Sequence, residues 1–249
     1  EAGQRVGQEA APAKKKKPIP LILAGAAATC PMAEQIPPER VSAYKQENPD
    51  VTVCAYINTS AALKAECDVC VTSSSAVRIV RQLDALRILF IPDKNLGAYV
   101  AAQVPEKEIV LWDGYCPVHN QITGQDVASA RDAHPGALVA MHPECPPEAV
   151  ALADMVGSTA EIIHFIETTD RPVIVATERG VVDGLSIRYP EKTLIQLCPH
   201  KLVCEDMKLT TLQGLVLALK GEGGLTVELE EGLRLRAKKS IDAMLRYGG

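Results

Sequence analysis

Short apolar runs alternate with amphipathic stretches along most of this chain. The runs are rich in Val, Ile, Leu and Ala and end at polar, Gly or Pro residues, as strands do. They predict strands at residues 18–24, 51–57, 68–72, 87–92, 108–112, 137–142, 173–177 and 193–197. Helical spacing of apolar positions predicts a helix that begins near Pro38 and helices at 60–66, 74–86, 95–103, 124–133, 147–153, 159–167 and 182–189. Alternating strands and helices predict an α/β fold with parallel sheets.

The pattern changes near the end of the chain, where residues 210–220 and 228–247 both have helical spacing. We therefore expect a disordered lead-in at 1–17, an α/β domain at 18–107 carrying Cys30, and a second at 108–197 carrying Cys116. A helical C-terminal part at 198–249 then carries Cys204. The run Lys14 to Lys17 is typical of a solvated lead-in, and a nucleic-acid patch is the alternative.

Three cysteines recur at nearly equal spacing. Cys30, Cys116 and Cys204 are 86 and 88 residues apart, and each follows an apolar run. The elements between them have the same order, which predicts an internal repeat although residue identity between the copies is weak. Ligands of parallel sheets bind beyond the carboxyl ends of the strands, where these thiols are expected. Soft sulfur ligands at one such site favour a metal or an iron-sulfur cluster.

The remaining cysteines suggest simpler roles. Cys67 and Cys70 have the C-x-x-C spacing of a redox or zinc motif, but they fall in a predicted strand and no second C-x-x-C exists, so a structural role is favoured. Cys198 precedes a proline, as Cys30, Cys116 and Cys145 do, and it therefore competes with Cys204 for the third place in the trio.

Composition narrows the class of protein. A hydrophobic content of 47% is that of a globular chain with a core, and the net charge of −5 with 4% aromatic residues argues against nucleic-acid binding. No apolar stretch is long enough to span a bilayer, and no signal peptide is evident. With eight cysteines and no secretion signal, a reducing, cytoplasmic location is expected.

Several segments together resemble the quinolinate synthases of de novo NAD biosynthesis. They occur in the family's order, and they are ATCPMA at 28–33, YINTS at 56–60, PDKNLG at 92–97, GYCPVH at 114–119, HPEC at 142–145, VGST at 156–159, TE at 177–178 and CEDMKLTTL at 204–212. The resemblance implies repeated three-layer α/β domains in a pseudo-threefold arrangement around a [4Fe-4S] cluster. It implies Cys30, Cys116 and Cys204 as the three cluster ligands, because the Met207-Lys208 context favours Cys204 over Cys198.

The resemblance also implies the reaction, which condenses iminoaspartate with dihydroxyacetone phosphate and loses phosphate and two waters. Three cysteines leave one iron without a protein ligand, and such an iron can act as a Lewis acid. An L-aspartate oxidase that supplies the imine is a candidate functional partner, and no nucleic acid or membrane is expected as one.

The candidate site residues follow from the matching segments. The resemblance implies that His142 and Glu144 supply acid/base catalysis and contact substrate, and that Tyr56 acts with them. Substrate binding is expected at these residues and at Asn58, Ser73, Ser158 and Thr159. Ser158 and Thr159 open a helix, whose N-terminus favours anions, but helix capping is the alternative role for their hydroxyls.

Two further expectations remain open. His119 is a candidate hydrogen-bond partner of the cluster site, whereas Asp93, Asn95 and Glu178 are expected only to hold loops. The family carries an N-terminal α/β domain with an H-N-Y-Q segment that this sequence lacks, so we expect the first domain to be largely missing and activity of this chain alone to be low. The alternative function is an iron-sulfur or thiol redox-sensing protein without synthase activity.

Overall fold

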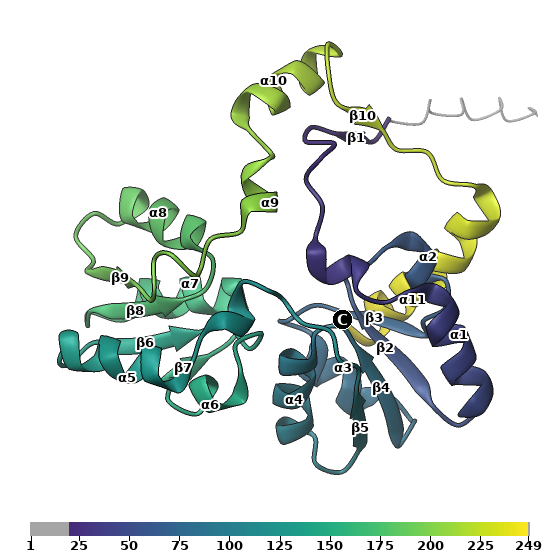
Figure 1. Ribbon diagram of the computed structural model, residues 1–249, viewed down its shortest axis with the longest axis horizontal. Coiled ribbons are helices and arrows are strands. Elements are labelled where there is room, and N and C mark those ends of the chain that lie inside the picture. Colours follow the sequence, from purple (N-terminus) through teal and green to yellow (C-terminus); the bar gives the residue numbers. More distant parts are fainter. Residues whose placement is uncertain (1–19, 249) are drawn as a thin grey trace, which may run out of the picture.

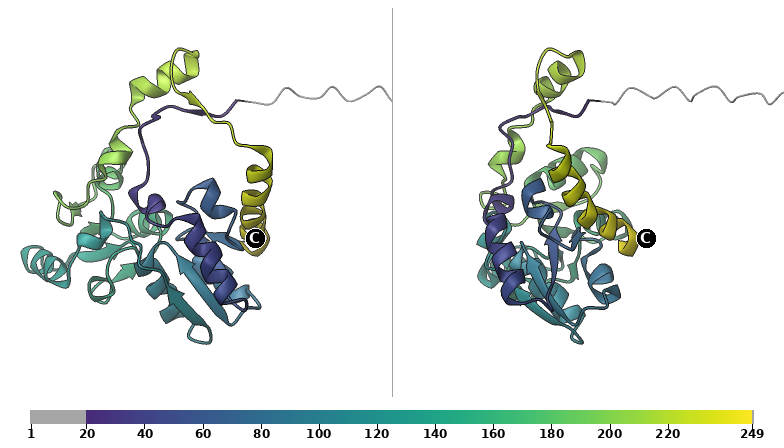
Figure 2. Two further views of the ribbon diagram at one scale, coloured as in Figure 1. Left: turned by 45° about the vertical axis from the view of Figure 1, so that its right-hand side comes forward. Right: turned by 90° about the vertical axis from the view of Figure 1, so that its right-hand side faces the viewer.

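The structure is a computed structural model and describes residues 20–248. The lead-in expected at residues 1–17 lies outside this part. Two four-stranded parallel sheets stand side by side, and a thin arm projects above them (Figures 1 and 2). The expected α/β class with parallel sheets is confirmed.

The first unit is a three-layer sandwich. Its sheet has the order β3-β2-β4-β5 and contains β2 (Thr52–Tyr56), β3 (Val69–Val71), β4 (Arg87–Ile91) and β5 (Glu108–Leu111). One face packs against α1 (Pro38–Glu47) and α2 (Ala61–Lys64), and the other against α3 (Ala76–Gln82) and α4 (Lys94–Gln103). The central strands are buried on both faces, which explains their continuous apolar sequence.

The second unit repeats this plan. Its sheet has the order β7-β6-β8-β9, with β6 (Leu138–Met141), β7 (Met155–Val156), β8 (Val173–Ala176) and β9 (Leu194–Gln196). Helices α5 (Gly124–Ala133) and α6 (Pro147–Val150) pack on one face, and α7 (Thr159–Thr168) and α8 (Arg179–Arg188) on the other. The internal repeat expected from the cysteine spacing therefore corresponds to two copies of one topology.

Two strand assignments need correction. The strand expected to open the second domain at residue 108 is β5, and its hydrogen bonds to β4 make it the edge of the first sheet. The strand expected at 18–24 is only β1 (Ile22–Leu23), which pairs antiparallel with β10 (Leu225–Thr226) and joins neither parallel sheet. The tail beyond Cys204 is consequently not purely helical.

The C-terminal segment divides between the arm and the first unit. Cys204 leads into α9 (Glu205–Lys208) and then into α10 (Leu212–Lys220), which ends at Gly221 in a left-handed turn with φ of 72°. The last helix, α11 (Glu231–Gly248), returns to the first unit and packs on β3, α2 and α3 (Figure 1). Among the helices of residues 20–248, none has both the length and the apolar character needed to cross a membrane.

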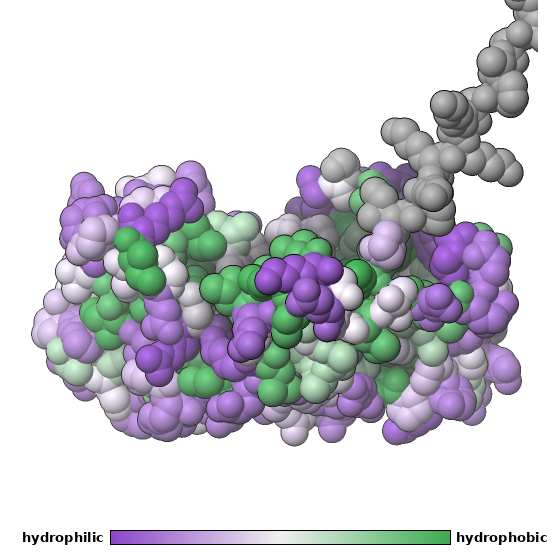
Figure 3. All heavy atoms as spheres, turned by 90° about the horizontal axis from the view of Figure 1, so that it is seen from above, coloured by the Kyte–Doolittle hydropathy of each residue, from purple (hydrophilic) through white to green (hydrophobic). Residues whose placement is uncertain are grey.

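The arm has little core of its own. It comprises β1, β10 and α10, and several of its apolar side chains are exposed. Figure 3, which is seen from above, shows green areas on the face from which the arm projects. Leu212 is 78% exposed and Leu219 is 79% exposed, values far above those of the leucines in the two units' cores. Exposed apolar residues that gather on one element are typical of an interaction site.

Candidate functional site

A cavity of about 370 Å³ lies where the carboxyl ends of both sheets meet. The residues that line it come from both units and from the loops between them. They are Thr29, Cys30, Met32, Tyr56, Asn58, Cys116, Val118, His119, His142, Glu144, Thr159, Thr177, Glu178, Val181, Cys204 and Met207. The fold thus brings together most of the side chains that the sequence pattern selected, from positions up to 174 residues apart.

The cysteine trio lines this cavity. Cys30, Cys116 and Cys204 are free, half-buried thiols, and Cys30 and Cys204 each stand immediately before a helical turn. Burial raises the pKa of Cys30. Three soft donors that reach one cavity from three separate loops are a donor set suited to a metal centre.

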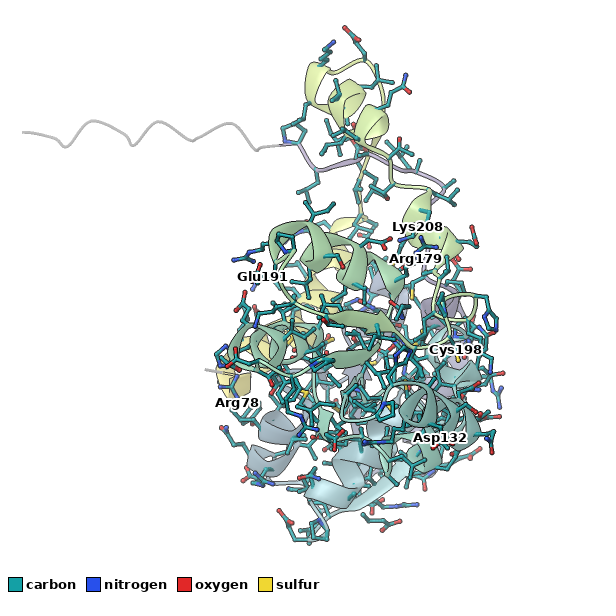
Figure 4. The ribbon with its side chains drawn as sticks, turned by 90° about the vertical axis from the view of Figure 1, so that its left-hand side faces the viewer. Arg78, Asp132, Arg179, Glu191, Cys198 and Lys208 are labelled. Carbon is teal, nitrogen blue, oxygen red and sulfur yellow. The ribbon has the colours of Figure 1, made fainter. Side chains whose placement is uncertain are left out.

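Cys198, the competitor for the third place, does not line the cavity. Its thiol interacts with the Asp126 carboxylate, and burial together with that carboxylate raises its pKa to about 11. Figure 4 shows Lys208 and Arg179 at the junction of α9 and α8, with Cys198 lower on the same side of the chain. The geometry therefore favours Cys204 over Cys198.

A hydrogen-bonded group connects one of these thiols to a carboxylate. His119 Nδ1 lies 3.3 Å from Cys116 Sγ and 3.0 Å from Glu144 Oε2, and its Nε2 lies 3.1 Å from Thr177 Oγ1. Ligand atoms of Cys116, His119 and Glu144 all lie within 4.8 Å of one another, so they could hold a metal ion. His119, expected as a hydrogen-bond partner at this site, thus contacts the thiol of Cys116 and also the carboxylate of Glu144.

The charges in this group are coupled. Burial lowers the pKa of His119, but the hydrogen bonds with Cys116 and Glu144 outweigh burial and leave it raised. Burial opposes ionisation of Glu144, yet the hydrogen bond from His119 and the proximity of His142 leave its pKa below the usual range. Glu144 is consequently a carboxylate at neutral pH, although only 5% of its surface is exposed.

His142 is held in the neutral form. Its ring stacks on His119 with centroids 4.9 Å apart, and burial lowers its pKa to about 4. The backbone N–H of Glu144 donates to His142 Nδ1 at 3.4 Å, which leaves the ring proton on Nε2. One ionised carboxylate and one neutral imidazole therefore stand side by side.

Tyr56 completes the inner wall at the end of β2. Burial and the nearby carboxylate of Glu144 raise the pKa of its phenol. Ser73 is half-buried and does not line the cavity, whereas Asn58 does. The cavity therefore includes Asn58 of this predicted pair but not Ser73.

Ser158 and Thr159 have different positions. Thr159, the first residue of α7, lines the cavity. The Ser158 hydroxyl forms a capping box with Glu161, donating to its carboxylate at 2.7 Å, and Ser158 faces a neighbouring hollow between α7 and Ser74. The capping alternative therefore describes Ser158, and a direct substrate contact remains a prediction for Thr159.

Thr177 is the site residue that sequence reasoning left without a role. Its hydroxyl fixes the far nitrogen of His119 and so the orientation of the ring. Its position directly after a buried strand was a usable signal, because strand ends line sites in parallel sheets. The residues expected to hold loops, Asp93 and Glu178, do so: each caps the helix that follows it.

Fold and site together define a class: a repeated α/β protein with a thiol, imidazole and carboxylate centre where its two sheets meet. The family described as "Quinolinate synthetase A protein" matches residues 12–246. The quinolinate synthase of Caldicellulosiruptor bescii is 45% identical over 235 residues, which cover 94% of this chain and 76% of that protein. The quinolinate synthase of Methanoregula boonei is 43% identical, covering 90% and 74%.

A third relative shows similar coverage. "Quinolinate synthase 1" of Methanosarcina acetivorans is 39% identical over 96% of this chain and 78% of its own length. The chain belongs to the quinolinate synthase family, a family of enzymes.

Proposed function

We propose that this chain is a quinolinate synthase that condenses iminoaspartate with dihydroxyacetone phosphate, releasing phosphate and two waters. The observation that carries the proposal is that three thiols and the Tyr56, His142 and Glu144 group face one cavity. The names of the relatives agree with it.

The donor set fits a [4Fe-4S] cluster. Cys30, Cys116 and Cys204 supply three thiols from three loops, which is the soft ligand type that such clusters use. When bound through three thiolates, a cluster supplies one iron without a protein ligand, a Lewis acid for a substrate oxygen or nitrogen. His119 would hold Cys116 in place through its ring nitrogen.

The protein's own groups provide the proton transfers. Glu144 is ionised and is the group that can accept a proton. Neutral His142 carries its proton on Nε2, from which it can donate a hydrogen bond to a substrate oxygen. Loss of water from a carbon acid requires a base for the carbon-bound proton, and Glu144 is the candidate base in the cavity that Tyr56 also lines.

Anionic substrate groups have two candidate contacts. Thr159 stands at the N-terminus of the ten-residue helix α7, where free N–H groups favour a phosphate or carboxylate. Asn58 adds an amide on the opposite side, at the end of β2. Both side chains are exposed in the cavity region and are therefore available to a ligand.

A further α/β unit covers the exposed arm in this proposal. The apolar residues of α10, β1 and β10 lack a covering layer among the described residues, and the chain spans 76% of the length of the relative from C. bescii. An additional unit packed there would bury these apolar side chains.

Anaerobic reconstitution of the chain tests the function. We expect iron, sulfide and the visible cluster absorption in the wild type, and loss of most of each in Cys30→Ser, Cys116→Ser and Cys204→Ser. Cys198→Ser is the matched control, because Cys198 lies outside the cavity, and it should keep the cluster.

Product analysis separates an enzyme from a sensor. Loaded wild-type protein supplied with both substrates should form quinolinate. A cluster without any product would favour the redox-sensing alternative, and the absence of a cluster would contradict both iron-sulfur functions.

A further inference from the structure

The two units each carry an acidic residue at the same place. It is the second residue after the third strand of the sheet, Asp93 after β4 and Glu178 after β8. Both side chains are buried, with exposures of 0% and 7%. Buried carboxylates are uncommon unless their oxygens are hydrogen-bonded. The hydrogen-bond partners of Asp93 and Glu178 therefore indicate what these side chains do.

Asp93 bridges a helix and a cysteine. Its Oδ1 accepts hydrogen bonds from the backbone N–H groups of Asn95 and Leu96 at 2.7 and 2.9 Å, which caps α4. Its Oδ2 accepts from the backbone N–H of Cys116 at 2.6 Å. One carboxylate therefore joins the first residues of α4 to a loop 23 residues further along the chain.

Glu178 makes the corresponding bridge in the second unit. Its Oε2 accepts from the N–H of Gly180 at 2.7 Å and caps α8, while its Oε1 accepts from the N–H of Cys204 at 3.4 Å. Lys208 adds an ion pair at 2.8 Å. A Cβ atom at position 180 would lie 2.8 Å from the carboxylate, so glycine permits this close approach.

We infer that Asp93 and Glu178 are positioning residues that fix the backbone of Cys116 and Cys204, the cysteines that follow the next strand in each unit. In each residue one carboxylate oxygen accepts from N–H groups at a helix N-terminus, which fixes the position of the carboxylate. The other oxygen can then hold the backbone N–H of the cysteine in place. The inference rests on the proposed function in taking these cysteines as cluster ligands.

The repeat thereby places a carboxylate against the backbone N–H of a cavity cysteine in both units. The helix dipole favours the negative side chain, and the buried setting strengthens each hydrogen bond. The same device built from aspartate in one unit and glutamate in the other indicates that the carboxylate, rather than the side-chain length, is what both units require.

Asp93→Asn is the central test. Asparagine caps helices as well as aspartate does, but with its oxygen on α4 its amide nitrogen cannot accept from the N–H of Cys116. We expect iron loss to a chelator from the loaded protein to become about tenfold faster, as for other partners of metal ligands. Glu178→Gln should accelerate iron loss less, because the hydrogen bond of Glu178 with Cys204 is longer than that of Asp93 with Cys116. Glu178→Asp, which keeps a carboxylate, should lose iron more slowly than Glu178→Gln.

Glu161→Gln is the matched control. Glu161 is also an acidic residue of a helix cap, in α7, and its carboxylate accepts from the N–H of Ser158 rather than from a cysteine. Its iron-loss rate should equal that of the wild type. Equal acceleration in Glu161→Gln and Asp93→Asn would mean that loss of any acidic cap destabilises the site, and would overturn the inference.

A second readout needs no cluster. In the metal-free chain, Asp93→Asn should increase the rate of Cys116 alkylation several-fold, measured by peptide mass, while Cys30 in the same molecule reacts at its wild-type rate. If the asparagine variant does not fold, Asp93→Ser keeps a capping oxygen and removes the second acceptor. Unchanged Cys116 alkylation in a folded variant would refute the positioning role, whereas failure to load iron in the wild type would refute only the proposed function.

Discussion

The two α/β units share one backbone plan but place different chemistry at equivalent points. Strand β2 ends at Tyr56, and Asn58 follows it; the residues 86 positions later are His142 and Glu144, which follow β6. In the first unit the pair offers a phenol and an amide, and in the second an imidazole and a carboxylate. The repeat therefore supplies the geometry, and divergence within the repeat supplies distinct binding and acid/base groups.

The units also differ in their covering layers. Helix α11 packs on β3, α2 and α3 of the first unit, and Ala243 of α11 joins the core next to the sheet. The second unit is covered by helices from its own segment of the chain. The first unit thus depends on residues from the far end of the chain, and the second does not.

The largest effect is expected when the second unit is given the residue that stands at the equivalent position after β2. Glu144→Asn places the first unit's residue in the second unit and removes the ionised carboxylate. We expect the rate of quinolinate formation by cluster-loaded protein to fall by roughly 100-fold or more, the usual contribution of general acid/base catalysis. Glu161→Gln is the control outside the cavity, and a Glu144→Asn rate within about threefold of wild type would show that Glu144 is not the base.

Weakening the packing of α11 should destabilise the first unit and leave the second unit nearly unchanged. Ala243→Glu forces a charged side chain into the first unit's core and should lower its free energy of unfolding by about 3 kcal/mol or more. Amide hydrogen exchange should accelerate in β2 and β4 and change little in β6 and β8. Leu245→Glu on the same helix is the control, since Leu245 is 65% exposed. Equal acceleration in both sheets would show that the units unfold together.

The ion pair of Asp126 should give the second unit a pH-dependent contribution that the first unit lacks at the corresponding position. Asp126 is ion-paired with Lys201 at 2.7 Å, whereas Arg40 occupies the corresponding position of the first unit. Burial opposes ionisation of Asp126, but hydrogen bonds from Lys201 and Thr123 leave its pKa below the usual range. Because the folded-state pKa is depressed, the stabilisation is present above the unfolded-state pKa and is lost as the pH falls through the folded-state value.

Denaturant unfolding at pH 7 and at pH 3 measures this contribution, which we expect to be about 1–2 kcal/mol. Asp126→Asn should remove the part of the pH dependence that appears in the exchange of β6 and β8. Asp132→Asn, an exposed position of the same helix marked in Figure 4, should leave it in place. Persistence of the full pH dependence in Asp126→Asn would assign it to other carboxyl groups.

The arm, which belongs to neither unit, should show the smallest effect. Leu212→Lys and Leu219→Lys alter side chains that are almost fully exposed and should change the free energy of unfolding of this chain by less than about 0.5 kcal/mol. Thermal unfolding at several protein concentrations is the measurement. A larger or concentration-dependent loss would show that a second copy of the chain covers α10, contrary to the proposed α/β unit.

Much of the fold follows from local pattern. Parallel central strands are buried on both faces, so they appear in the sequence as apolar runs, and the helices between them have clear polar caps such as Thr123 and Asp93. The elements that needed correction are those whose place in a sheet depends on which strand they pair with. β1 and β10 have two residues each, and β5 joins the first sheet only because its backbone aligns with β4.

The candidate site shows the same division. Cysteine spacing and the motif at His142 and Glu144 selected residues that meet in one cavity. The central place of His119, the orienting contact from Thr177 and the occupation of the Ser158 hydroxyl by its own helix cap were not accessible from spacing, because each depends on which side chains lie within hydrogen-bond distance after folding.

By itself, the sequence determined the alternation of strands and helices, the repeat and the three recurring thiols, since these depend on the chemistry and order of nearby residues. Only the tertiary structure decided that α11 completes the first unit and that Asp93 and Glu178 accept hydrogen bonds from the cysteines beyond the next strand. The physical reason is that burial and hydrogen bonding act over a few ångströms in space, whereas these partners are separated by up to 176 residues along the chain.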